Sequence, residues 1–299
     1  MREEIEVSPY NNMLGYRKGY TASFVKDTID KRKLAGLMIF DHLDRLDSLS
    51  FLKDYGFLKK LNIDSINDQD FGFLKYLTDL DHLRIGLSVK ESNVIDLSNQ
   101  QNLESLDIKW RKGKIIGLEK CQNLTSLCLV DFKEVDFSAV TQLIKLKELI
   151  VKTSAIRTVN GLSSFPLLEN LVLGNCRSLK SIEDIAGLKN LISLEIDLCS
   201  KIEDYSSIGS LTKLKNLGLL DCKGVNSIKF VEGLKYLQKL SLLGTTDVLD
   251  GDMKPAKNVK NVFYYHRKHY NLKIENKEHD QLIKSNLEKI IKGLFNSKA

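Results

Sequence analysis

Leucine, isoleucine and valine recur along this chain in the pattern Leu-x-x-Leu-x-Leu, where x is any residue. The second apolar residues of successive copies are 21 to 24 positions apart. A fixed period of this length is the signature of a repeat architecture. Copies start at Leu58, Leu80, Leu103, Leu124, Leu146, Leu168, Leu191, Leu214 and Leu237, with weaker copies at Leu34 and Val259.

The second and third apolar residues of each copy alternate, which predicts a short strand with every other side chain facing inward. One such strand cannot bury its apolar face. Stacked about 4.8 Å from identical neighbours, it gains hydrogen bonds and its leucines join a continuous core. Burial of one leucine stabilises the fold by roughly 1.5 to 3 kcal/mol. The pattern therefore predicts a solenoid of about ten to eleven repeats.

A second apolar series follows each predicted strand, with residues mostly three positions apart. This spacing favours short helical or 3₁₀ turns on the outer, convex side of the stack. The clearest members are Leu179, Ile182, Ile185 and Leu188, then Ile202, Ile208 and Leu211, and then Val225, Ile228, Val231 and Leu234.

Three segments resemble the leucine-rich-repeat family through its Asn/Cys position: Leu168–Cys176, Leu191–Cys199 and Leu214–Cys222. The period is similar to that of phosphatase-regulator-like and bacterial internalin-type repeats. The resemblance covers residues 34–265 and implies an α/β solenoid, a right-handed curved array with a parallel concave sheet, convex helical or 3₁₀ turns and capped ends. Earlier copies depart from the pattern at the Asn/Cys position, where they have Ser88, Arg111, Phe132 and Ser154.

Both ends of the array are predicted to be covered, because an open core layer would otherwise contact water. Residues 1–33 form the N-terminal cap, with Tyr10, Tyr16, Tyr20 and Phe24 as lids. Residues 266–299 form the C-terminal cap, with Asn276 at the start of an amphipathic helix. That helix either seals the core or docks on a partner. Its apolar side is formed by Leu282, Ile283, Leu287, Ile290, Ile291 and Leu294.

Residues that flank the inward leucines face the concave side, where a partner would touch them. Two apolar groups stand out there: Val130, Ile150 and Val172, and then Leu220, Leu243, Phe263 and Tyr265. Glu195 and Asp197 lie between the groups and could meet a basic residue of the partner. Exposed apolar patches tend to mark interaction sites. The alternative is that strand propensity alone favours these side chains.

Basic residues gather at two places. Lys109, Trp110, Arg111, Lys112 and Lys114 could bind nucleic acid by stacking and phosphate contacts, although a solvated turn anchored by Trp110 is the favoured interpretation. Near the C-terminal cap, a second basic region would suit a partner with an acidic surface. It comprises Lys257, Lys260, Arg267, Lys268 and Lys273.

Cys176, Cys199 and Cys222 repeat at 23-residue intervals and are predicted to stack along one edge. A zinc site needs ligands that converge on one point, whereas a column of thiols points in parallel. We therefore expect buried thiols bonded to the turn backbone, with no metal and no cofactor. The sequence has no nucleophile elbow, phosphate-binding Gly-rich loop or His-x-x-x-His pair, so an enzyme is not expected.

The chain has 299 residues, of which 42% are hydrophobic and 28% charged, and its net charge is +6. Its first seven residues, Met1–Val7, are charged where a secretory signal would be apolar. Together with five cysteines, an odd number, this predicts a cytoplasmic location.

These patterns predict a non-catalytic protein-interaction module that binds a protein partner on its concave face as a monomer. With 45 basic and 39 acidic residues, the charge is too mixed to favour nucleic acid. Val262–Tyr270 is similar to segments that close some bacterial repeat proteins, including ones linked to toxin immunity. That resemblance implies a bacterial toxin-neutralising protein. The alternatives are an internalin-type surface or secreted adhesion protein and a nucleic-acid-binding protein that uses the basic clusters.

Overall fold

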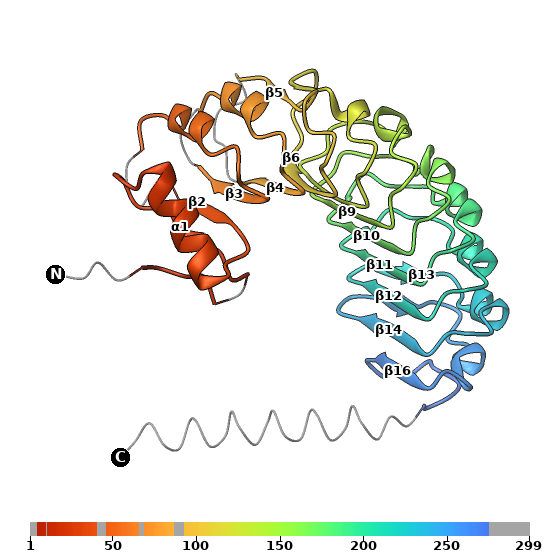
Figure 1. The fold of residues 1–299 in the computed structure, drawn as a ribbon. Helices are drawn as coiled ribbons and strands as arrows, with labels where there is room; N and C mark the ends of the chain where they lie inside the picture. The colour runs from red at the N-terminus through yellow and green to blue at the C-terminus, as the bar shows by residue number, and fades with distance from the viewer. Residues whose placement is uncertain (1–4, 10, 41–45, 66–68, 87–92, 275–299) are drawn as a thin grey trace, which may run out of the picture.

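The computed structural model describes residues 5–9, 11–40, 46–65, 69–86 and 93–274, which form one curved array (Figure 1). A twelve-stranded parallel sheet lines the inner side of the curve, and short 3₁₀ helices line the outer side. Apolar side chains fill the space between the two layers. The α/β solenoid predicted from the repeats and the family resemblance is confirmed.

The strands of the sheet follow one another in chain order, and each parallel neighbour is reached through the outer layer. They are β1 (Leu14–Gly15), β2 (Leu37–Phe40), β3 (Lys60–Asp64), β4 (His82–Gly86), β6 (Ser105–Lys109), β8 (Ser126–Val130), β9 (Glu148–Lys152), β10 (Asn170–Gly174), β11 (Ser193–Asp197), β12 (Asn216–Leu220), β14 (Lys239–Leu243) and β16 (Asn261–Tyr264). Two small parallel pairs lie apart from this sheet: β5 (Ile95–Asp96) with β7 (Ile115–Ile116), and β13 (Gly224–Val225) with β15 (Asp247–Val248).

The sequence period sets the register of the sheet. Leu171 of β10 pairs with Leu149 on one side and with Leu194 on the other, so one repeat length separates neighbours in space. All three side chains are at most 1% exposed. The second apolar residue of each repeat is therefore a core residue, as predicted.

The outer layer is built from the second apolar series. Its 3₁₀ helices are η1 (Ser50–Asp54), η2 (Gly72–Tyr76), η3 (Leu118–Lys120), η4 (Ser138–Val140), η5 (Leu162–Ser164), η6 (Glu183–Gly187), η7 (Ser206–Ser210), η8 (Lys229–Gly233) and η9 (Lys254–Ala256). Ile185, Ile208 and Val231 occupy equivalent positions in η6, η7 and η8, and all three are buried. The prediction of convex 3₁₀ turns is confirmed.

The first residue after six strands adopts the left-handed backbone conformation, which turns the chain out of the sheet. The φ angles are 58° at Asp131, 55° at Thr153, 55° at Asn175, 53° at Leu198, 50° at Asp221 and 65° at Gly244. Asp131 and Thr153 precede Phe132 and Ser154, two of the departures from the family pattern. The turn geometry is thus kept in those repeats, even without Asn or Cys.

At the N-terminal end, α1 (Ala22–Arg32) packs beside β1, and the Thr21 side chain accepts a hydrogen bond from the Phe24 backbone at its start. Tyr16 is buried and stacks on Phe51, with ring centroids 4.7 Å apart. Phe24 is 39% exposed, so it is not the lid that the sequence suggested. Tyr10 lies outside the described residues.

Within the described ranges, no helix has the length and apolar character needed to cross a membrane.

At the C-terminal end, residues 266–274 fold back onto the turn that follows β14. The Tyr270 hydroxyl donates to Asp247 (2.9 Å) and accepts from the Val248 amide (3.1 Å). Arg267 forms an ion pair with Asp247, 3.1 Å away. These contacts fasten the last described segment to the array. The predicted helix that begins near Asn276 lies outside the described residues.

Replacement of Leu194 by alanine is expected to lower the free energy of unfolding by about 2 to 5 kcal/mol, because it empties a fully buried position in the middle of the stack. Lys152→Ala is the control, since Lys152 is an exposed side chain on a nearby strand, and it is expected to change stability by less than about 0.5 kcal/mol. Urea unfolding followed by circular dichroism measures both. Equal losses would show that the inward and outward positions are wrongly assigned.

Candidate functional site

The concave face is formed by the strand residues that alternate with the buried leucines. Because the strands are parallel and in register, equivalent residues stack into columns across the face. The central column is Met38, Asn62, Arg84, Asp107, Cys128, Ile150, Val172, Glu195, Gly218, Ser241 and Phe263. A neighbouring column contains Asp64, Gly86, Lys109, Val130, Lys152, Gly174, Asp197, Leu220 and Leu243.

Charged side chains in the N-terminal half of this face pair with one another. Arg84 lies 3.7 Å from an oxygen of Asp64 and 3.5 Å from one of Asp107, so a single guanidinium serves two carboxylates on adjacent strands. Lys109 lies 3.8 Å from Asp131. This half of the face is therefore polar and largely neutralised by its own ion pairs.

The first apolar group lies at the centre of the array. Ile150 and Val172 are direct neighbours on β9 and β10. Val130 belongs to the adjacent column, where it neighbours Lys152. All three side chains are partly exposed. The structure thus brings together the residues that the sequence grouped, on the face away from the core.

The second apolar group lies near the C-terminal end. Leu220 and Leu243 are neighbours on β12 and β14, and Phe263 follows Ser241 in the central column on β16. Tyr265, just beyond β16, is 58% exposed. The ammonium group of Lys239 lies 5.4 Å from the centre of the Phe263 ring, within the range of a cation–π contact.

Glu195 and Asp197 separate the two apolar groups, as predicted. Glu195 lies between Val172 and Gly218, and Asp197 lies between Gly174 and Leu220. Glu195 is exposed and has no ion-pair partner among the described residues. Partial burial, together with the nearby carboxylate of Asp221, raises the pKa of Asp197. A cation placed here would relieve that repulsion.

A hollow of about 440 Å³ opens on the concave face around Gly218, between β11, β12 and β14. The sequence interpretation did not identify it, although a glycine inside a strand pattern is a signal for close approach of another molecule. Glu195, Ser241, Leu220 and Leu243 are among its lining residues.

No family model and no curated protein matches this chain. Solved structures do match it. An internalin (InlF) from Listeria monocytogenes aligns with a TM-score of 0.50 and 17% identity, over 80% of this chain and 74% of the internalin chain. TLR13, solved in complex with ssRNA13, aligns with a TM-score of 0.50 and 16% identity, over 87% of this chain and 47% of the TLR13 chain.

The chain folds as a leucine-rich-repeat protein. The twelve-stranded parallel sheet, the 3₁₀ helices on the convex side and the period shown by the register are the features of this fold. At this level of identity, the likeness establishes the fold alone.

The cluster around Trp110 is an internal contact between two leucine-rich repeats. The Trp110 indole is 7% exposed, packs edge-on against Phe132, and donates to a Glu134 carboxylate oxygen 3.1 Å away. Lys112 pairs with the other oxygen of Glu134 at 3.0 Å. This geometry agrees with the favoured interpretation of Trp110 as an anchor.

Arg111 differs from its predicted place in a solvated turn. Its side chain is 2% exposed, lies over the Phe71 ring and donates to the Asn93 carbonyl oxygen. Arg111 stands at the repeat position that Cys176, Cys199 and Cys222 have in later repeats, so a long side chain is buried where those repeats have a small thiol. The sequence showed the departure but not its consequence.

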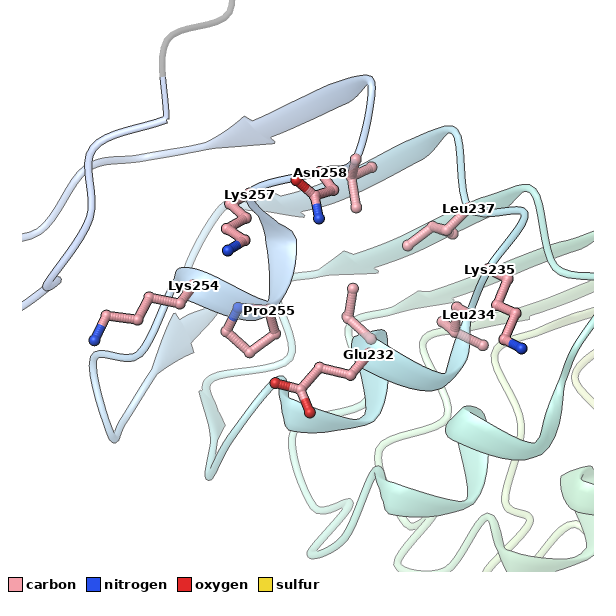
Figure 2. Close-up of a pocket in the computed structure, with 10 residues that line it drawn as sticks. Glu232, Leu234, Lys235, Leu237, Lys254, Pro255, Lys257 and Asn258 are labelled. Carbon is pink, nitrogen blue, oxygen red and sulfur yellow. The ribbon is translucent and has the colours of Figure 1, made fainter.

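The second basic region is spread over the C-terminal repeats. Arg267 holds Asp247, as described above, while Lys257, Lys260, Lys268 and Lys273 are exposed. A convex hollow of about 470 Å³ between η8 and η9 has Lys235, Lys254 and Lys257 in its lining. Figure 2 shows Lys235 and Lys254 at opposite ends of this hollow with their ammonium groups turned away from each other. The lysines do not converge on one ligand.

The cysteine column is structural. The Cys199 thiol donates to the carbonyl oxygens of Leu173 and Asp197, and the Cys222 thiol to those of Ile196 and Leu220, at 3.2 to 3.4 Å. Cys176 makes the equivalent contact with the carbonyl of Gly174. Thiols held by backbone carbonyls are what the sequence predicted. Within the described part of the chain, no three His, Cys, Asp or Glu side chains are grouped as metal ligands.

Trp110 is the single tryptophan, so its fluorescence reports directly on the basic cluster. We expect a blue-shifted emission that a single-stranded oligonucleotide does not quench at low salt, because the indole is buried against Phe132. Titration with a fluorescence readout measures this. Strong quenching that weakens steeply as salt increases would instead support nucleic-acid binding.

The buried cysteines are expected to react slowly with a thiol reagent in the native protein at pH 8. Burial and the neighbouring Cys199 raise the pKa of Cys222 to about 12, and the hydrogen bond with Cys176 and burial raise that of Cys199. The reactive thiolate is therefore scarce. In denaturant, all five should react rapidly. A fast native reaction at Cys199 or Cys222 would contradict the burial of the column.

Proposed function

We propose that this leucine-rich-repeat protein is a non-catalytic binding module, and that the concave face from β8 to β16 binds a protein partner. The observation that carries the proposal is the contrast between the two halves of the face. In the N-terminal half, Arg84 neutralises its neighbours. From β8 to β16, the two apolar groups remain partly exposed on the face turned away from the core.

The energetics of binding follow from this contrast. Removing apolar surface from water contributes about 25 cal/mol for each Å², from which the entropic cost of association is subtracted. Phe263 and Tyr265 have aromatic side chains, which often contribute a large share of the binding free energy at an interface. Glu195 and Asp197, between the apolar groups, would select a partner with a basic residue at the matching place. The arrangement therefore supports both affinity and selectivity.

Toxin neutralisation in the bacterial cytoplasm is the specific function we propose within this class. A rigid concave face suits tight binding of a folded partner, and all five cysteines are free thiols, which fits a reducing compartment. The alternative is adhesion at the cell surface, which the internalin-like repeat period suggests. Protease treatment of intact source cells separates the two, because only a surface protein would be digested.

The test of concave-face binding is an affinity capture from source-cell lysate with the native protein and with a Val172→Glu/Phe263→Glu double variant. One charge is placed in each apolar group. We expect a specific partner to be captured by the native protein and lost with the variant, because the complex would have to bury two unpaired carboxylates. Quantitative mass spectrometry compares the captured proteins.

The matched control is Ile144→Glu/Tyr236→Glu, which also replaces one aliphatic and one aromatic residue by glutamate. These side chains are 55% and 64% exposed and lie outside the concave strands. The control should capture the same partner as the native protein. Equal capture by the concave variant would contradict binding on this face.

A further inference from the structure

The hollow at Gly218 is a depression in the central column of the concave face. Gly218 lies between Glu195 on β11 and Ser241 on β14 in the central column. Because glycine has no side chain, its neighbours become walls around exposed backbone. The volume of about 440 Å³ lies within the range of roughly 300–1,000 Å³ found for ligand pockets.

The backbone does not require glycine at this position. Gly218 does not have a positive φ angle, and an added Cβ would lie 3.5 Å from Cγ of Glu195, an ordinary contact. Gly86 is different, because a Cβ there would lie 2.2 Å from a carboxylate oxygen of Asp64. Glycine in a strand is less stable than alanine, because it loses more conformational freedom on folding. Its presence without a local need points to another molecule that approaches the backbone.

The walls of the hollow differ in chemistry. Glu195 supplies a carboxylate on one side, and Leu220 and Leu243 supply apolar surface on the other. Lys239 is the one cation in the lining, and its ammonium group lies over the Phe263 ring of the next strand. Asp197 and Asp221, at the adjacent edge of the face, add to the negative potential.

We propose that this hollow receives a long cationic side chain, arginine or lysine, of the partner protein. This inference rests on the proposed function and specifies what the partner presents. The aliphatic stem would lie along Leu220 and Leu243, and the charged end would pair with Glu195 in a charge-assisted hydrogen bond. The missing side chain at position 218 lets the stem approach the sheet.

The test uses a probe that does not depend on the partner. N-acetyl-arginine-methylamide is titrated into protein with labelled leucine methyl groups, and the methyl resonances of Leu220 and Leu243 are followed by NMR. We expect saturable shifts at both residues. The norleucine analogue, which has the stem without the charge, and the glutamate analogue should shift them much less.

Two variants test whether the probe binds in the hollow. Glu195→Gln keeps the shape and removes the charge, and it should weaken binding of the arginine probe roughly three- to tenfold. Gly218→Leu fills the hollow and should abolish the shifts. The matched controls are Glu232→Gln, on the convex helix η8, and Gly174→Leu, where a Cβ also meets only ordinary contacts. Both controls should bind the probe like the native protein.

The inference is overturned if the arginine probe causes no shifts, if norleucine binds equally well, or if the glutamate probe binds better. Its failure differs from failure of the proposed function. A partner that is lost with Val172→Glu/Phe263→Glu but retained by both Glu195→Gln and Gly218→Leu would leave concave binding intact and exclude the hollow. A partner retained by every variant would exclude the face itself.

Discussion

Each repeat of this protein has an apolar face that only a neighbouring repeat can cover, and the whole structure depends on that requirement. A strand with two inward aliphatic side chains has too little surface of its own to offset the entropy lost when the chain is ordered. Stacking removes the deficit, since Leu171 is enclosed by Leu149 and Leu194 on the adjacent strands. The outer 3₁₀ helices close the other side of the same layer. The array curves with the sheet on its inner side and the 3₁₀ helices on its outer side (Figure 1).

The same constraint leaves the concave positions free. Every second strand residue is fixed by the core, and the residues between them can vary without loss of the fold. The N-terminal strands use this freedom for ion pairs such as Arg84 with Asp64 and Asp107. The C-terminal strands use it for partly exposed aliphatic and aromatic residues and for the hollow at Gly218. A rigid sheet holds these groups at fixed spacing, so little ordering entropy is lost when a partner binds.

The period predicted most of the fold, because core positions in a solenoid depend on residues within the same repeat. The inward leucines, the convex series ending at Leu188 and the thiol contacts of Cys199 all follow from their place in the repeat. Arg111 and Asp247 could not be placed in this way. The burial of Arg111 depends on Phe71 and Asn93, and Asp247 is held by Arg267 and Tyr270. These contacts join irregular segments of different repeats, and no period encodes them.

In the candidate site too, the positions of the residues could be predicted from the sequence, but their contacts could not. The alternation of strand residues placed Val130, Ile150, Val172, Leu220, Leu243 and Phe263 on one face, and the register confirmed that placement. How much of each side chain its neighbours cover, and where the face is hollowed, depends on side-chain lengths on three adjacent strands. The sequence showed Gly218 in its column but not the shape that its neighbours build around it.

The most direct measurement is photo-crosslinking in living source cells, with a benzophenone amino acid placed at position 172 on the concave face or at position 144 outside it. Concave-face binding predicts that irradiation links the residue at position 172 to one protein species, and that position 144 gives no such product. A crosslink to the same species from position 144 alone would contradict the account.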